Sequence, residues 1–300
     1  MHKVQQRTDL AMEARELAVG VRAGDIDGVK YEEDEIQGVK YQKLTVENEN
    51  GQKTIGKPIG TYYTAEIASV LRRESETFND TVSVLASLLK DLLDKPKDDG
   101  CTLVVGLGNR DITPDNIGPR CAESVLVTRH LKKHAPQDFL FLSPVAVISP
   151  GVMGSSGIES ADYIKWVCDN LKPDRVVIVD ALAARSLDRL CRTVQMTDTG
   201  ITPGSGVGNS RSAINSQTLG VPVVAVGVPT VVDIRSLLAD MGNAETSGKA
   251  LESNDMIVTP RNIDSEVVCA SRVVAYAINL ALHDGLSVED IDMLVGKCFT

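Results

Sequence analysis

Two acidic side chains follow two apolar, strand-like segments of the sequence. The first segment is 102–107, and Asp115 lies in the polar loop that follows it. The second segment is 175–179, and it ends directly on Asp180. The carboxyl ends of parallel strands meet at one edge of an open α/β sheet, where binding and active sites form. The sequence therefore predicts that Asp115 and Asp180 lie near each other at that edge.

Two carboxyl groups close together can perform acid–base catalysis. Both cannot ionise cheaply, so one of them keeps its proton. The ionised group can activate water, while the protonated group donates to a carbonyl oxygen or a leaving nitrogen. Most loop aspartates are caps, so the alternative is that Asp115 caps a helix from Ile117 and that Asp180 caps the turn after its strand. Spacing alone leaves both interpretations open.

The turn after the first strand contains Gly106, Gly108 and Asn109. A dinucleotide-binding motif would have a third glycine where Asp111 stands, and a carboxylate there would repel phosphate. We therefore expect no nucleotide cofactor. The glycines instead let the backbone turn tightly and bring Asp115 back over the sheet edge.

Other metal and nucleophile motifs are weak. His130 and His134 lie four residues apart on one helix face, as a metal pair would. Their lysine and arginine neighbours, and the absence of a glutamate after His130, favour a solvated basic face. None of the six cysteines forms a CxxC pair, so neither a zinc site nor a redox motif is indicated. No histidine follows either strand, so a Ser-His-Asp triad lacks its base.

Composition favours a globular protein with an aliphatic core. The 300 residues are 43% hydrophobic but only 4% aromatic, which suits a parallel sheet covered by helices. The net charge of −10 argues against nucleic-acid binding and is compatible with a basic protein partner. The N-terminus lacks the apolar region of a signal peptide. No apolar run approaches the roughly 20 residues that span a bilayer.

The periodicity predicts an α/β fold with a mostly parallel sheet flanked by helices, because strands alternate with helices from residue 101 onward. A small antiparallel β element is expected over 26–57, where GVKY occurs twice and 52–55 can pair back. Two glycine-rich loops, 149–160 and 199–212, are expected to face a ligand or substrate. The remaining expected elements are helices over 10–19, 77–93, 117–134, 161–171, 230–241, 264–283 and 286–295, and strands over 145–149, 194–197, 221–227 and 256–258.

Four segments together resemble one known family, the germination protease of spore-forming bacteria. They are RTDLAMEARE at 7–16, VVGLGNRDITPDNIGP at 104–119, SPGVMGSSGIE at 149–159 and IVDALAARS at 178–186. The similarity runs over nearly the whole chain. That family consists of endopeptidases of an unusual aspartic type, which degrade the small acid-soluble proteins that coat spore DNA. Its fold is similar to that of the hydrogenase-maturation endopeptidases.

The resemblance implies specific roles and partners. It places the catalytic pair on Asp115 and Asp180, with no metal and no cofactor. It implies a zymogen that removes residues 1–9 by cleavage between Asp9 and Leu10, leaving a single protease domain over 10–300. The segment after that bond, LAME, is similar to the family's substrate sites. The resemblance also implies a homotetramer in the cytoplasm of the spore core, without direct contact to nucleic acid or membrane.

Two other functions stay open at this point. A metal-dependent maturation-type endopeptidase could share the fold, although those enzymes use a Glu, an Asp and a His. Asp115 stands in the place of that Glu, and the sequence offers no convincing partner for the His. A non-enzymatic binder of basic proteins would also suit the acidic composition.

Overall fold

The computed structural model describes residues 8–21, 26–71, 75–95, 100–135, 137–208, 211–234, 236–237 and 256–297. Its strands are β1 (Val29–Ile36), β2 (Val39–Val46), β3 (Gly60–Glu66), β4 (Thr102–Gly106), β5 (Val145–Ile148), β6 (Arg175–Ala184), β7 (Thr193–Thr197), β8 (Val223–Asp233) and β9 (Ile257–Val258). Its helices are α1 (Ala11–Val21), α2 (Glu49–Ile55), α3 (Ala68–Leu71), α4 (Ser75–Leu92), α5 (Ile117–Glu123), α6 (Arg129–His134), α7 (Met153–Ser156), α8 (Ser160–Leu171), α9 (Ser216–Leu219), α12 (Ile263–Leu282) and α13 (Val288–Lys297). Short 3-10 turns are η1 (Thr113–Asp115), η2 (Leu187–Arg189) and η3 (Ser205–Val207).

The strands form one mixed sheet in the order β1-β2-β3-β7-β8-β6-β4-β5, and β9 pairs with the end of β8. Strands β5, β4, β6 and β8 are mutually parallel, whereas β7, β3, β2 and β1 continue the sheet in antiparallel fashion. The predicted α/β class, with a parallel core and an antiparallel N-terminal element, is confirmed. The antiparallel part is larger than expected, because β3 and β7 join it directly to the core.

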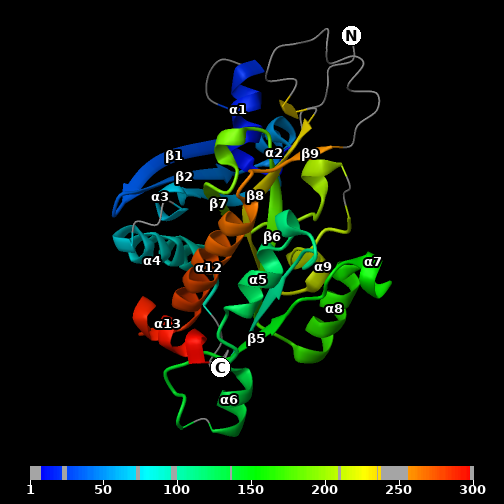
Figure 1. The fold of residues 1–300 in the computed structure, drawn as a ribbon. Coiled ribbons are helices and arrows are strands. Elements are labelled where there is room, and N and C mark those ends of the chain that lie inside the picture. Colours follow the sequence, from blue (N-terminus) through cyan, green and yellow to red (C-terminus); the bar gives the residue numbers. More distant parts are fainter. Residues whose placement is uncertain are drawn as a thin grey trace.

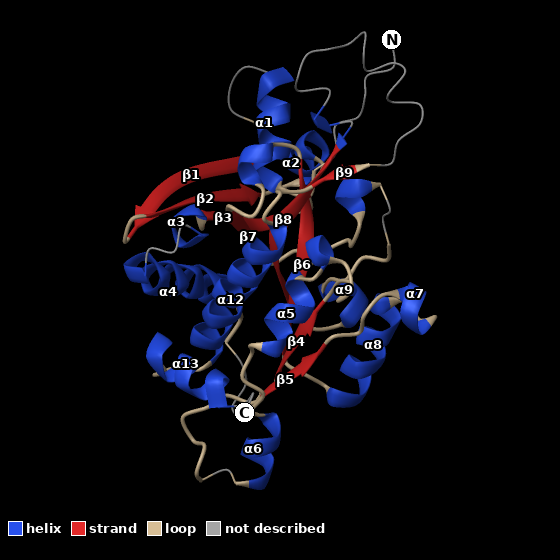
Figure 2. Ribbon diagram, viewed as in Figure 1, coloured by secondary structure: helices blue, strands red, loops and turns tan. Residues whose placement is uncertain are grey.

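Helices cover both faces of the sheet (Figures 1 and 2). Apolar side chains of α4, α5 and α12 pack against one face, which includes Val177 and Val179 of β6. Side chains of α8 and α9 pack against the other face, which includes Val176 and Ile178. This alternation along β6 is the two-residue period of a strand buried on both sides.

Helix α12 is long and apolar enough by length and composition to cross a membrane, which the sequence pattern did not suggest. Two thirds of its most apolar window (67%) is buried inside the protein. The helix lies against α4 and α5, with side chains such as Val273 and Ile278 in the core. Its apolar character is therefore that of a central core helix.

The expectation that 52–55 pairs back as a strand is wrong, because these residues form the end of α2. The side chain of Asn48 accepts hydrogen bonds from the N–H groups of Asn50 and Gly51, which starts a helix where a turn was expected. The strand that pairs with β2 is instead β3, with Leu44 opposite Tyr62.

The predicted helix over 117–134 is two helices, α5 and α6. Between them, the side chain of Asn279 accepts from the N–H of Leu126 and donates to the carbonyl of Ser124. These bonds satisfy the backbone groups that a continuous helix would have paired. The predicted helix over 230–241 begins as strand, because β8 pairs with β6 and β9 as far as Asp233; residues 235 and 238–241 lie outside the described part.

Candidate active site

Asp115 is positioned by the tight connection between β4 and α5. Its carboxylate Oδ2 accepts a hydrogen bond of 2.8 Å from the backbone N–H of Asn109. Gly108 has φ +119°, and a Cβ added there would lie 2.0 Å from the carbonyl oxygen of Asp115. Only glycine fits this close approach, so the predicted role of the glycine turn has a structural basis.

The same connection packs α5 closely against the sheet. A Cβ added at Gly106 would lie 2.2 Å from the carbonyl oxygen of Gly118. One added at Gly118 would lie 2.5 Å from the carbonyl oxygen of Val179, which itself accepts from the N–H of Leu107. The η1 turn that carries Asp115 is thereby held in contact with β6 and β8.

Asp180 lies inside β6, whereas the sequence placed it at the strand's end. β4 pairs with β6 only as far as Val179, and β6 continues past it along β8, with Asp180 opposite Gly227. Asp180 therefore sits just beyond the end of β4, at the sheet edge that the sequence predicted. Its side chain is only 6% exposed, and its Oδ1 accepts one hydrogen bond, of 2.9 Å, from the N–H of Ala181.

The two carboxyl groups differ in their electrostatic surroundings. Burial raises the pKa of Asp115, and the Asn109 hydrogen bond and the charge of Arg211 oppose that shift. Burial raises the pKa of Asp180 well above its ordinary range, and the negative charge of Asp115 raises it further. These surroundings favour the protonated form more strongly at Asp180 than at Asp115. The structure thus places Asp115 near enough to Asp180 for its charge to raise the pKa of Asp180.

The two glycine-rich loops reach this region to different extents. In the 199–212 loop, Arg211 is close enough to lower the pKa of both carboxyl groups. In the 149–160 loop, the Ser149 hydroxyl donates to the carbonyl of Gly106 at 3.1 Å. Most other residues of the 149–160 loop are exposed.

The segment that contains the predicted cleavage bond is built into the fold. The backbone N–H of Asp9 donates to the carbonyl of Ala183, and the N–H of Ala183 donates to Asp9 Oδ2 at 2.8 Å. The hydroxyl of Ser205 donates to the other carboxylate oxygen of Asp9. Leu10 is fully buried in an apolar cluster with Leu182, Ala184, Leu190 and Val232. Asp9 also lies near enough to Asp180 to raise its pKa.

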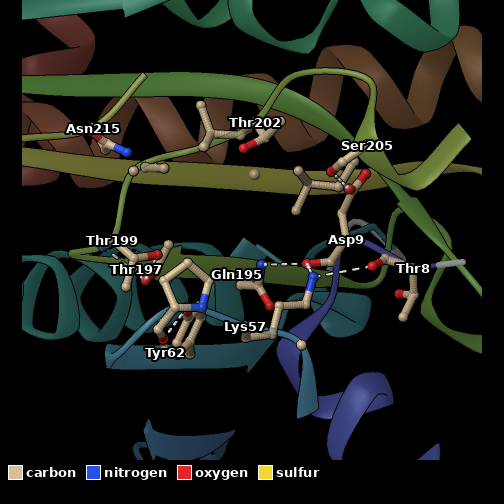
Figure 3. A pocket seen from close by; sticks show the side chains of 17 residues that line it. Thr8, Asp9, Lys57, Tyr62, Gln195, Thr197, Thr199, Thr202, Ser205 and Asn215 are labelled. Carbon is tan, nitrogen blue, oxygen red and sulfur yellow. Dashed lines mark hydrogen bonds between the residues drawn. The ribbon is translucent and has the colours of Figure 1, made fainter. Parts of the chain in front are cut away.

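A cavity of about 330 Å³ adjoins this segment. Figure 3 shows the side chains of Lys57 and Gln195 converging on Asp9 at its wall. Leu182 and Gly227, from β6 and β8, also line the cavity. Sequence reasoning missed Lys57 and Gln195, since a lysine between Gly56 and Pro58 and a glutamine inside a strand carry no local motif.

The remaining candidates take no part in this site. His130 and His134 lie exposed on the short helix α6, as a solvated basic face predicts. Cys121, Cys168 and Cys191 are buried, and Cys101 and Cys269 are partly buried; Cys298 lies outside the described residues. In the described ranges, no group of three His, Cys, Asp or Glu side chains is arranged to hold a metal ion.

Comparison with known proteins identifies the family. The sequence profile of the family described as "Germination protease" matches residues 6–243, which include Asp115 and Asp180. The germination protease of Caldanaerobacter subterraneus subsp. tengcongensis is 40% identical over 96% of this chain and 98% of its own length. That of Clostridium perfringens is 39% identical over 95% of this chain, and that of a Geobacillus species is 44% identical over 78% of this chain and 65% of its own.

Among solved structures, a nickel–iron hydrogenase maturation protease from Thermococcus kodakarensis aligns with 65% of this chain and 98% of its own, at 18% identity and a TM-score of 0.36. The family profile and the full-length relatives agree with the resemblance drawn from the sequence motifs. The chain belongs to the germination protease family and is a protease.

Proposed function

We propose that the protein is an aspartic-type endopeptidase in which Asp115 and Asp180 activate a water molecule. The observation that carries this proposal is the burial of Asp180 beside the charge of Asp115, which keeps one carboxyl protonated while the other ionises. Asp115 then takes a proton from the water, and Asp180 donates a hydrogen bond to the carbonyl oxygen of the peptide. The proton returns to the leaving nitrogen when the peptide bond breaks.

The substrates proposed from the family resemblance are the small acid-soluble proteins of the spore, whose degradation begins during germination. The acidic net charge of −10 supports attraction of a basic substrate. We further propose that the chain is made as a zymogen in the cytoplasm of the spore core, assembles as a homotetramer, and removes residues 1–9 by its own activity. The domain that remains is 10–300.

The test is cleavage of a purified small acid-soluble spore protein by the enzyme that begins at Leu10, followed by intact mass. Discrete fragments with and without excess chelator are expected, because the proposed chemistry needs only carboxyl groups. Fragments that disappear with chelator and return with a divalent ion would contradict the metal-free mechanism. A folded enzyme that binds the substrate and yields no fragments would contradict the protease assignment for this substrate.

Asp115→Asn should remove the cleavage, and Asp111→Asn provides the matched control. Asp111 is an exposed residue of the same loop, and its backbone N–H donates to Asn109 Oδ1. Cleavage by Asp111→Asn should stay within about twofold of the unmodified enzyme, since most exposed substitutions have small effects.

A further inference from the structure

The peptide bond between Asp9 and Leu10 has its carbonyl oxygen held by two side chains. Lys57 Nζ donates to this oxygen at 2.8 Å, and Gln195 Nε2 donates to it at 3.2 Å. Lys57 also donates to the preceding carbonyl, that of Thr8, at 3.1 Å. Figure 3 shows both side chains reaching Asp9; Lys57 comes from the connection between α2 and β3, and Gln195 comes from β7.

The nitrogen side of the same bond is also fixed. The N–H of Leu10 donates to Thr8 Oγ1 at 3.0 Å, and that hydroxyl donates to the buried carboxylate of Glu13. The next N–H, that of Ala11, donates to Gln195 Oε1 at 2.6 Å. Gln195 therefore binds both sides of the bond, which together with the buried Leu10 side chain holds this peptide in one geometry.

The surroundings of Lys57 are unusual for a structural lysine. Within the described part of the chain, its recorded hydrogen bonds go to two neutral carbonyl oxygens. Burial lowers the pKa of Lys57, and the charges that face it, those of Asp9 and Glu13, oppose the shift. A buried ammonium is costly unless negative charge offsets it. A carbonyl oxygen that becomes negative during a reaction would supply that charge.

Peptide hydrolysis creates such a charge. Water adds its oxygen to the carbonyl carbon of Asp9 and gives a proton to the carboxyl pair, and the carbonyl oxygen becomes an oxyanion. The C–N bond then breaks, and the carboxyl pair returns a proton to the nitrogen of Leu10. The products are a carboxyl group on Asp9 and an amine on Leu10. Donors aimed in advance at the oxyanion stabilise the transition state more than the ground state.

We propose that Lys57 and Gln195 bind the carbonyl oxygen of the Asp9–Leu10 peptide and stabilise the negative charge that forms on it when the chain cleaves itself. This inference rests on the proposed self-processing at that bond. It adds two catalytic groups, from the α2–β3 connection and from β7, to the carboxyl pair at the edge of β4 and β6.

The test uses the full chain and follows its conversion to the form that begins at Leu10 by intact mass. Lys57→Met should slow conversion by about 100-fold or more, because it removes one oxyanion donor and its charge. Lys53→Met is the matched control, since Lys53 is a lysine of the neighbouring helix α2 whose side chain is 76% exposed. The control should convert at the unmodified rate within about twofold.

A pH profile separates catalysis from a structural role. On the alkaline side, the rate of the unmodified chain should fall with the loss of two protons, one from Asp180 and one from Lys57. Lys57→Arg should retain part of the rate and fall with the loss of only one proton, because a guanidinium stays charged. A lysine that only supports the fold would leave the number of protons unchanged.

The possible outcomes are distinct. This inference alone is overturned if Lys57→Met converts at the unmodified rate. It is also overturned if the alkaline fall in rate involves the same number of protons in Lys57→Arg as in the unmodified chain. If Lys57→Met does not fold, the Lys57→Arg profile decides. An unmodified chain that never converts overturns this inference together with self-processing. The separate assay of the enzyme that begins at Leu10 then shows whether the proposed protease activity stands.

Discussion

Two buried carboxyl groups of this molecule, Asp180 and Glu13, have opposite surroundings. Glu13 is fully buried, and it accepts hydrogen bonds from the N–H groups of Arg185 and Ser186 and from the hydroxyl of Thr8. Asp180 is 6% exposed, and its one recorded hydrogen bond comes from the N–H of the next residue, within the ranges that the structure describes.

The difference indicates different roles. The N–H groups of Arg185 and Ser186 bind the Glu13 carboxyl group and so anchor α1 to the chain after β6. A buried carboxyl group with one donor and a negative neighbour stays protonated and is ready to give a proton away. Depth of burial alone therefore does not distinguish Asp180 from Glu13, whereas the number of hydrogen-bond donors does.

The largest expected effect comes from Asp180→Asn. The rate of substrate cleavage should fall by about three orders of magnitude or more, because the asparagine amide cannot act as an acid or a base in the proton transfers of the proposed mechanism. The free energy of unfolding should change by less than about 1 kcal/mol, since a neutral amide replaces a neutral acid and keeps an oxygen for the N–H of Ala181. Steady-state rates and urea unfolding of the same preparation measure both. Near-normal cleavage would remove Asp180 from the mechanism.

Glu13→Gln, unlike Asp180→Asn, should lower the free energy of unfolding substantially. The glutamine amide accepts hydrogen bonds through its oxygen but not through its nitrogen, so at least one buried donor loses its partner. The free energy of unfolding should therefore fall by about 3 kcal/mol. Glu16→Gln is the control, because Glu16 pairs with Arg189 at the surface and its loss should cost less than about 1 kcal/mol. Urea unfolding of the two variants in parallel provides the measurement. Equal losses would show that the three donors do not make Glu13 an anchor.

An effect that appears only at acidic pH is expected from His283, a buried group far from the proposed chemistry in sequence. It is 1% exposed, its Nδ1 accepts from the N–H of Ser143 at 3.1 Å, and burial lowers its pKa to about 4 against the opposing charge of Asp284. Because the folded pKa lies below the ordinary value of 6.5, stability is fully present above pH 6.5 and is lost as the pH falls towards 4.

The free energy of unfolding should be lower by about 1 kcal/mol at one pH unit below 6.5, and by about 3 kcal/mol when the pH reaches about 4. In this pH range, His283→Gln should reduce the slope of the free energy of unfolding against pH by the contribution of one proton. Urea unfolding at a series of pH values tests it. Identical profiles for the two proteins would show that His283 is not the group responsible.

The sequence predicted the core of the fold because its signals are local. The apolar runs of β4 and β6 are long and end near aspartates, and the glycine turn before Asp115 has the residue types that its geometry demands. The length of β6 was underestimated, since the pairing of Ala183 and Ala184 with β8 depends on strands distant in sequence. The sequence does not distinguish α2 from a turn followed by a strand over 52–55, because Asn48 serves equally well in a turn and as a helix cap.

The site was predictable only in part for the same reason. Asp115 follows β4, and Asp180 lies in β6 just beyond the end of β4, so the parallel pairing of these two strands brings both to one edge. Lys57 and Gln195 meet Asp9 across 48 and 186 residues of sequence, and no spacing rule connects them. Only the folded chain places both donors on the carbonyl oxygen of Asp9.

The proposed mechanism requires that Asp180 keep its proton at a pH where Asp115 has ionised. Carbon NMR of protein labelled at the aspartate carboxyl carbons can follow both groups, with Asp115→Asn and Asp180→Asn assigning the signals. We expect Asp180 to titrate well above Asp115, and its pKa to fall in Asp115→Asn because that change removes the neighbouring charge. Titration of Asp180 in the ordinary range of an aspartate, unaffected by Asp115→Asn, would contradict this expectation.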